Sequence, residues 1–240
     1  MKIVVFDCDG TITPKGSAAW NSIRVYLGLD DKAKNFYSYI YKKFRANEIT
    51  YQQWCEITCK YFKSKNFTYH DFLKATKNNV LINGASETFK TLTENGYNLH
   101  ILSGGIKQHI INILGDNRKY FDDVSANEFI FDENNLLSGI VCTKYDFETK
   151  KDYIENIKQK YNLKASDIYF IGNSFNDEWV ALSGCNTICF NPTETSIDDS
   201  FKWNYVIHNS DTLTDILTFV LNKNKQINPK IIKKDDGKLY

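Results

Sequence analysis

The sequence predicts an α/β protein: a doubly wound parallel sheet with a small all-helical cap domain inserted after the first strand. Three observations lead to this prediction. Short apolar runs rich in branched and aromatic residues are typical of buried parallel strands. Helical patterns lie between these runs, and this alternation indicates a sheet covered by helices on both faces. One long segment, 15–79, breaks the alternation with helical patterns alone.

Five segments are the predicted strands: Ile3–Phe6, Leu99–Leu102, Ile168–Ile171, Thr187–Phe190 and, more weakly, Tyr205–Ile207. Helical patterns cover Ala85–Asn95, Ile106–Leu114, Lys151–Tyr161, a helix beginning at Glu178–Leu182, and Leu213–Leu221. The first of these ends at Gly96, a residue type that commonly terminates helices. The segment Asn127–Val141 has a polar turn between two apolar runs, and it predicts a β-hairpin.

The inserted segment is expected to form four helices: Ala18–Leu27, Lys32–Ala46, Tyr51–Phe62 and His70–Thr76. We therefore expect three parts: an α/β core at 1–14 and 80–222, a helical cap at 15–79, and a flexible tail at 223–240. The tail is polar and basic and contains Pro229 and Gly237, a composition typical of loose termini.

The composition suits a globular protein and excludes several other classes. The chain has 240 residues, of which 42% are hydrophobic and 25% charged, as in ordinary globular domains. A net charge of +1 provides no electrostatic attraction for nucleic acid or an anionic membrane. No apolar run approaches the roughly 20 residues that span a bilayer, and the N-terminus lacks a signal-peptide pattern. We expect a cytoplasmic protein with reduced cysteines and no nucleic-acid or membrane partner.

Chemically active residues follow three of the predicted strands. In an open α/β sheet, ligands bind at the carboxyl ends of the strands. The segments at these ends are Asp7-Cys8-Asp9-Gly10-Thr11, Ser103-Gly104-Gly105 and Gly172-Asn173-Ser174-Phe175-Asn176-Asp177. Their carboxylates, hydroxyls and glycines suit a hard cation and a phosphate.

Asp7 and Asp9 are two residues apart and can take different roles. The first carboxylate can attack phosphorus and form an aspartyl-phosphate. The second can protonate the leaving oxygen and later deprotonate water. Because the attacking carboxylate and the phosphate are both anionic, a Mg²⁺ ion that bridges them would offset their repulsion. Gly10 would let backbone N–H groups face the phosphoryl oxygens.

Four segments in this order resemble the motifs of the haloacid dehalogenase-like (HAD) phosphatases. Residues 7–11 resemble motif I (DxDGT), Ser103 resembles motif II, Lys150 resembles motif III, and 173–177 resembles motif IV, usually GDxxxD. The helical insert resembles a C1 cap. Ser103-Gly104-Gly105 and the hairpin segment at Asn127 resemble the phosphoserine phosphatase branch most. The resemblance spans about residues 1–220, is specific at the motifs, and is vague in the cap.

The resemblance implies a Rossmann-like core, Mg²⁺ as the cofactor, and a role for each motif residue. Asp7 is implied as the nucleophile, Asp9 as the general acid and base, and Lys150 as the group that neutralises the Asp7–phosphate charge. Lys151 is the alternative for Lys150. The implied phosphate-binding residues are Gly10, Thr11, Ser103, Gly104 and Lys150, and the implied metal-binding residues are Asp7, Asp9 (through its backbone carbonyl), Asn173 and Asp177.

Two departures from the family pattern stand out. Motif IV usually has Asp directly after its glycine, whereas this chain has Asn173. An amide oxygen can bind Mg²⁺ but carries no charge, so weaker metal binding is expected. Phosphoserine phosphatases also place a Glu about nine residues after the nucleophile to hold the substrate amine, where this chain has Lys15-Gly16-Ser17. This departure weakens the assignment to phosphoserine.

The sequence thus predicts a Mg²⁺-dependent phosphomonoesterase that acts on a small phosphorylated metabolite, as a monomer or a homodimer. Two alternatives remain open. One is a phosphotransferase or phosphomutase built on the same core. The other is a weakly active regulatory protein that binds phosphate ligands, which the replacement at Asn173 favours.

Overall fold

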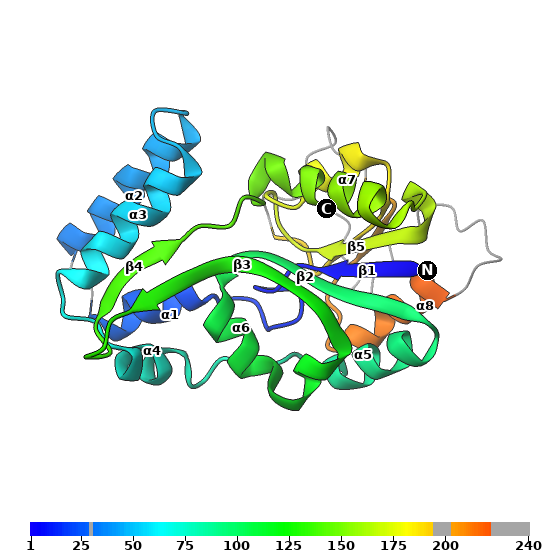
Figure 1. Ribbon diagram of the computed structural model, residues 1–240, viewed down its shortest axis with the longest axis horizontal. Coiled ribbons are helices and arrows are strands. Elements are labelled where there is room, and N and C mark those ends of the chain that lie inside the picture. The colour runs from blue at the N-terminus through cyan, green and yellow to red at the C-terminus, as the bar shows by residue number, and fades with distance from the viewer. Residues whose placement is uncertain (29–30, 194–202, 222–240) are drawn as a thin grey trace, which may run out of the picture.

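The computed structural model describes residues 1–28, 31–193 and 203–221, with the side chains of 31–33 left out. Seven strands form one sheet in the order β4-β3-β2-β1-β5-β6-β7 (Figure 1). All neighbouring strands are parallel except β3 and β4, which are antiparallel. The strands are β1 (Lys2–Phe6), β2 (Tyr97–Ile106), β3 (Phe121–Phe131), β4 (Leu137–Val141), β5 (Ile168–Gly172), β6 (Asn186–Phe190) and β7 (Tyr205–Ile207). The predicted strands and the predicted fold class are confirmed.

Helices cover both faces of this sheet (Figure 1). One face carries α5 (Ala85–Glu94), α6 (Lys107–Leu114) and α8 (Leu217–Leu221), and the other carries α7 (Lys150–Tyr161). The apolar run of β1 is continuous because both faces of this strand are covered by helices. Val4 and Phe6 pack with the first group of helices, whereas Ile3 and Val5 pack with α7. Burial of each such side chain stabilises the fold by about 1.5–3 kcal/mol, so both faces contribute.

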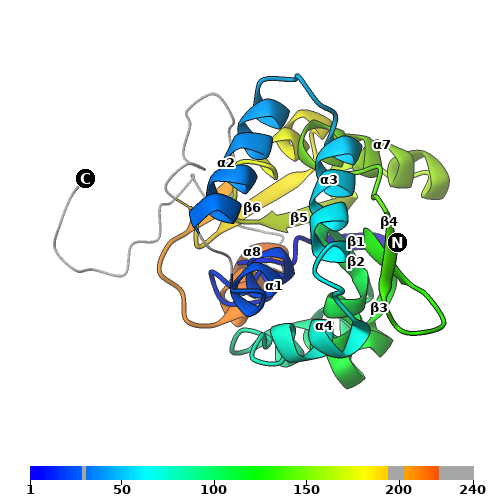
Figure 2. The same ribbon diagram turned by 90° about the vertical axis from the view of Figure 1, so that its left-hand side faces the viewer.

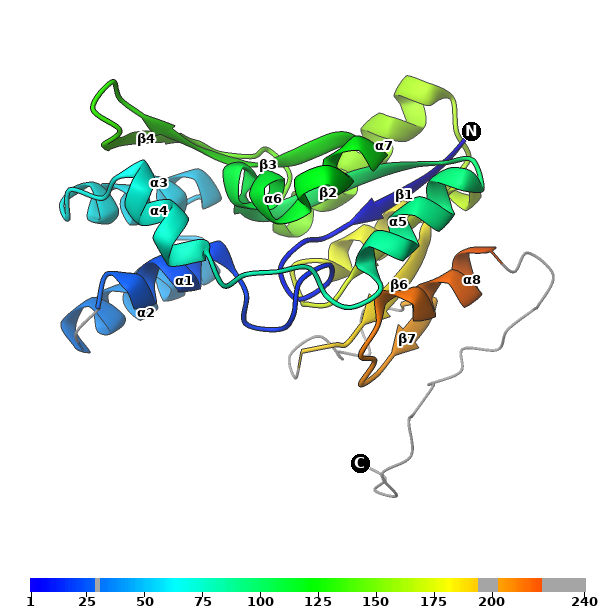
Figure 3. The ribbon, with the colours of Figure 1, turned by 90° about the horizontal axis from the view of Figure 1, so that it is seen from below.

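Four helices between β1 and α5 form the cap: α1 (Ala19–Tyr26), α2 (Asp31–Arg45), α3 (Tyr51–Lys63) and α4 (Tyr69–Thr76). Two of them begin with reciprocal capping boxes, Thr50 with Gln53 and Thr68 with Asp71, which satisfy backbone N–H groups that a helix start leaves unpaired. The cap lies at the end of the sheet toward which β1 runs (Figures 2 and 3). It therefore stands over the carboxyl ends of the parallel strands.

The predicted hairpin is present, but its first strand is longer than the sequence indicates. β3 begins at Phe121, pairs in parallel with β2, and then continues past the sheet edge to pair with β4. The polar residues Asp122, Asp123 and Ser125 interrupt the apolar pattern there. For this reason the sequence did not predict the first half of β3. The distal part of the hairpin completes the cap, because Phe129 and Leu137 share a buried cluster with cap helices.

Some predicted helices are partly 3₁₀ in form. The segments Glu178–Ser183 and Leu213–Ile216 are 3₁₀ helices, as are Gly115–Tyr120, Phe147–Thr149 and Ala165–Asp167. None of the helices among the described residues is long and apolar enough to cross a membrane. All six cysteines lie within the described residues, and none of them forms a disulfide bond there. The predicted tail at 223–240 lies outside the described residues.

Candidate active site

The sheet topology brings the candidate residues of separate segments together. β1 lies between β2 and β5, so Asp7 emerges between the ends of the strands that carry Ser103 and Asn173. The N–H of Asp7 donates to the carbonyl of Ile171 at 2.8 Å, which extends the strand pairing up to the carboxylate. Asp7, Ser103 and Asn173 are all buried. These three segments therefore meet at one place beneath the cap.

Lys150 forms the centre of an ion-pair cluster at this place. Its Nζ donates to Asp7 Oδ1 at 2.9 Å and to Asp177 Oδ1 at 2.5 Å, and Asp146 Oδ1 lies 3.9 Å away. The side chain is fully buried. Burial alone would lower the pKa of Lys150, but the charges of Asp177, Asp7 and Asp146 raise it above its usual value. The lysine is therefore charged, and it, rather than Lys151, reaches Asp7.

The two motif I carboxyls hold protons more tightly than ordinary aspartates. Burial, followed by the charge of Asp177, raises the pKa of Asp7 well above its usual value, although Lys150 opposes the shift. Burial raises the pKa of Asp9 to about 7; Lys150 lowers it and Asp146 raises it. A carboxyl that titrates near neutral pH is suited to give and take a proton.

This shift predicts a pH-dependent stability in metal-free protein. Because the pKa of Asp9 is higher in the folded state than in the unfolded state, its stabilising contribution is complete below about pH 4. This contribution is lost as the pH rises through about 7. The free energy of unfolding of the parent protein should therefore fall over this range, and that of the Asp9→Asn variant should fall less steeply. Urea unfolding with a chelator at several pH values measures both slopes. Equal slopes for the two proteins would contradict the prediction.

Asp177 stabilises the motif IV loop through hydrogen bonds to the backbone of the same loop. One oxygen of Asp177 accepts from Lys150, and the other accepts from the backbone N–H groups of Asn173 and Ser174, at 2.9 and 3.1 Å. Both oxygens are thus occupied, which favours a supporting role over direct metal binding.

Gly10 has a positive φ of 84°, and a Cβ placed there would collide with the Asn173 amide. The Gly10 N–H donates to the Thr13 hydroxyl at 3.1 Å, so phosphate binding by Gly10 stays a prediction.

Ser103 and Asp9 lie next to each other across Gly105. A Cβ placed on Gly105 would lie 3.1 Å from Asp9 Oδ2 and 3.2 Å from Ser103 Oγ. Ser103 Oγ also accepts from the Gly105 N–H at 3.0 Å. A side chain at this position would crowd both groups, so a glycine here lets the Asp9 carboxyl and the Ser103 hydroxyl lie close to the backbone.

Three residues that fix this site were not assigned to it from the sequence. The Gly104 carbonyl accepts from Trp20 Nε1 of the cap at 3.0 Å and from Asn127 Nδ2 at 2.7 Å. Asp146, which is buried, accepts from Asn176 Nδ2 at 3.0 Å and packs against Gly104. Asp146 and Thr149 form a capping box, so an Asp-x-x-Thr pattern before Lys150 was the available signal for Asp146.

The donor set fits a magnesium ion. Hard cations take oxygen ligands, and at this site three buried oxygens have no hydrogen-bond partner among the described residues: Asp9 Oδ1, Thr11 Oγ1 and Asn173 Oδ1. No group of three or more His, Cys, Asp or Glu in the described ranges has a metal-binding arrangement. The Asn173 amide oxygen and the Asp9 backbone carbonyl stay predicted ligands, and Asp177 is directed to Lys150.

A groove of about 600 Å³ runs between the cap and the core beside the cluster. Phe44 and Tyr51 of the cap line one side, and Asp146, Phe147 and Phe175 of the core line the other. The Phe44 and Phe147 rings meet edge to face, with centroids 4.8 Å apart. The groove is therefore formed only where the cap contacts the core, as a site for a small leaving group would be.

Comparison with known proteins finds the same fold in solved structures. A search of curated proteins found no match. The structure titled as the phospho-aspartyl intermediate analogue of phosphoserine phosphatase is 20% identical, has a TM-score of 0.70, and covers 91% of this chain and 98% of its own. A HAD family hydrolase from Salmonella enterica subsp. enterica serovar Typhi is 16% identical, has a TM-score of 0.72, and covers 93% and 72%. A phosphoserine phosphohydrolase-like protein from Francisella tularensis subsp. tularensis is 16% identical, has a TM-score of 0.63, and covers 92% and 100%.

At these identities the solved structures show a shared fold, and the family follows from the sequence itself. The model of the haloacid dehalogenase-like hydrolases matches residues 1–183. This range contains all four segments that meet beneath the cap, from Asp7 to Asp177. The chain belongs to the haloacid dehalogenase-like hydrolase family.

Proposed function

We propose that this hydrolase is a Mg²⁺-dependent phosphomonoesterase that acts on a small phosphorylated metabolite through an aspartyl-phosphate on Asp7. The observation that carries the proposal is the buried Lys150 ammonium between Asp7 and Asp177, with the Asp9 and Ser103 side chains across Gly105. A carboxylate that would act as the nucleophile, a carboxyl that would donate the proton and a cation therefore lie together beneath the cap, and this supports the proposal. The similarity to a phosphoserine phosphatase fold supports the reaction class.

The reaction would proceed in two displacements. An Asp7 oxygen attacks phosphorus, and the bond to the leaving oxygen breaks as the new bond forms. Asp9, whose pKa is about 7, gives its proton to that leaving oxygen. Asp9 then takes a proton from water, the water oxygen bonds to phosphorus, and the Asp7–phosphorus bond breaks. Inorganic phosphate leaves, and Asp7 and Asp9 return to their starting states.

The remaining residues would bind and neutralise the phosphate. Lys150 offsets the negative charge on Asp7 and the phosphoryl group, while the Ser103 hydroxyl and the Gly104 N–H hold phosphoryl oxygens. Asp7, the Asp9 carbonyl and Asn173 would hold Mg²⁺, which supplies further positive charge for the attack of one anion on another. Asp177 keeps the motif IV loop in place through its bonds to the loop N–H groups.

The test is phosphate release from a panel of small phosphomonoesters, with Mg²⁺ and with a chelator. The panel includes phosphoserine, phosphocholine, pyridoxal phosphate, nucleotides and sugar phosphates. Metal-dependent release without an added acceptor supports the proposal and excludes the phosphotransferase alternative. Folded protein that binds phosphate ligands but releases no phosphate would support the regulatory alternative instead. Cytoplasmic location and oligomeric state stay predictions.

Asn173→Asp should tighten Mg²⁺ binding at least severalfold. The Asn173 Oδ1 atom is buried without a partner in the described part of the chain, and a carboxylate there would add a charge to an otherwise similar ligand, which strengthens binding of a hard cation. Calorimetric titration with MgCl₂ measures the dissociation constant. The control is Asn134→Asp, the same change at an exposed turn residue. Equal affinities for all three proteins would argue against Asn173 as a ligand.

A further inference from the structure

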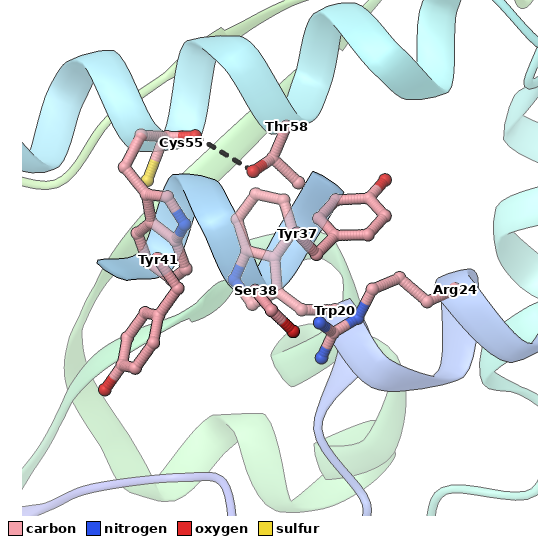
Figure 4. Close-up of a pocket in the computed structure, with 8 residues that line it drawn as sticks. Trp20, Arg24, Tyr37, Ser38, Tyr41, Cys55 and Thr58 are labelled. Atoms are coloured by element: carbon pink, nitrogen blue, oxygen red, sulfur yellow. Dashed lines mark hydrogen bonds between the residues drawn. The ribbon is translucent and has the colours of Figure 1, made fainter. Parts of the chain in front are cut away.

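A second hollow lies inside the cap, apart from the ion-pair cluster. It has a volume of about 330 Å³ and lies between α1, α2 and α3 (Figure 4). Half of the residues that line it are aromatic: Trp20, Tyr37, Tyr41 and Trp54. Trp20 and Trp54 are neighbours, with ring centroids 6.5 Å apart. Walls of this kind accept a flat apolar group.

Arg24 gives this cavity a positive charge. It is the one charged residue among the described residues that line the cavity. Its guanidinium lies over the Tyr37 ring, 5.3 Å from the centroid, and it contacts the neutral side chain of Asn21. No acidic side chain pairs with it within the described ranges. Burial lowers the pKa of Arg24, which reflects a charge that lacks full solvation and would gain from an anionic partner.

The position of the Arg24 charge indicates which chemical group a ligand of this cavity would carry. Figure 4 shows the Arg24 guanidinium and the Ser38 hydroxyl on the same side of the cavity, while Ser38 itself is exposed, so this side is open to solvent. A planar guanidinium matches a carboxylate through two parallel hydrogen bonds. A single cation without a second basic residue in the lining suits a monoanion rather than a second phosphate.

We propose that the cap cavity binds a small carboxylate with an apolar, preferably aromatic, body: Arg24 pairs with the carboxylate, and the tryptophan rings cover the body. Trp20 connects this site to the core, because its Nε1 donates to the Gly104 carbonyl at 3.0 Å. The ligand is either the leaving group of the substrate or a separate small acid. Binding itself does not depend on the proposed phosphatase reaction.

Calorimetric titration of the full chain with benzoate, octanoate and 3-phenylpropanoate tests the proposal. We expect saturable binding at one site, and about tenfold weaker binding of the neutral 3-phenylpropan-1-ol. Arg24→Gln should weaken carboxylate binding by about tenfold to a hundredfold, the range for a charge-assisted hydrogen bond, and leave the alcohol unaffected. Ser38→Trp should block the exposed mouth with Arg24 intact. Lys90→Gln, which removes an exposed cation on α5, is the matched control.

Three results would overturn the proposal: no saturable binding of any of the three acids, equal binding of acid and alcohol, or full binding by folded Arg24→Gln protein. A separate measurement identifies the source of the ligand. If 3-phenylpropanoate raises KM for p-nitrophenyl phosphate at constant kcat, the cavity holds the leaving group. If it changes kcat or neither constant, the cavity holds a separate acid. A protein that binds the acid but releases no phosphate would contradict the proposed function and leave the cavity site standing.

Discussion

Asp7→Asn should reduce phosphate release at least about a thousandfold, because it removes the nucleophile while its shape is retained. The amide oxygen can still accept the hydrogen bond that Lys150 Nζ gives to Asp7 Oδ1 at 2.9 Å, so the fold should persist. The variant should also lose the covalent intermediate. Rates on the best substrate and the mass of acid-quenched protein measure the two effects.

The control for this variant is Asp116→Asn, the same change at an exposed residue; it should leave the rate unchanged. The stability of Asp7→Asn is informative as well. Because burial raises the pKa of Asp7 well above its usual value, an uncharged amide should be tolerated, with a free energy of unfolding close to that of the parent protein at neutral pH. A folded Asp7→Asn protein with undiminished turnover would refute the nucleophile assignment.

The sequence alone indicates that residues at the ends of separate strands come together. The positions of Asp7, Ser103 and Asn173 follow from one rule: parallel strands place their carboxyl ends at one edge of the sheet. Four of the five apolar runs lie in strands that are largely buried on both faces, where polar residues are few. Lys150 was less certain, because sequence alone did not separate it from Lys151. Full burial at the start of α7 makes that distinction.

What the sequence did not reveal depends on contacts between distant segments. Strand β3 has one face only partly buried, with Asp122 and Asp123 among its residues, so its first half lacks an apolar run. The hydrogen bond from Trp20 to Gly104 joins residues 84 positions apart, and no local pattern encodes it. Asp146 belongs to the site because the chain from β4 returns it to Lys150 and Gly104.

Lys150→Met should destabilise the protein by about 3–5 kcal/mol at neutral pH, the usual cost when one partner of a buried ion pair is removed. The change leaves Asp7, Asp146 and Asp177 close together in a buried site without their cation. The loss in free energy of unfolding, relative to the parent protein, should be smaller at pH 5 than at pH 8. Burial already raises the pKa values of Asp7 and Asp146, and loss of the Lys150 charge raises them further. The folded variant therefore takes up protons that relieve the repulsion as the pH falls. Urea unfolding at the two pH values measures this.

Lys151→Met is the matched control, because Lys151 is adjacent and only half-buried, and no ion pair in the described part of the chain involves it. Its free energy of unfolding should change by no more than about 0.5 kcal/mol, as for most surface substitutions.

The same pair of variants tests the catalytic role of Lys150. Lys150→Met should lose phosphate release even at pH 5, where stability is partly restored, since the missing cation opposes the charge that gathers on Asp7 and phosphate. If activity returned together with stability, Lys150 would serve only to hold the fold, and the neutralising role would have to be assigned elsewhere.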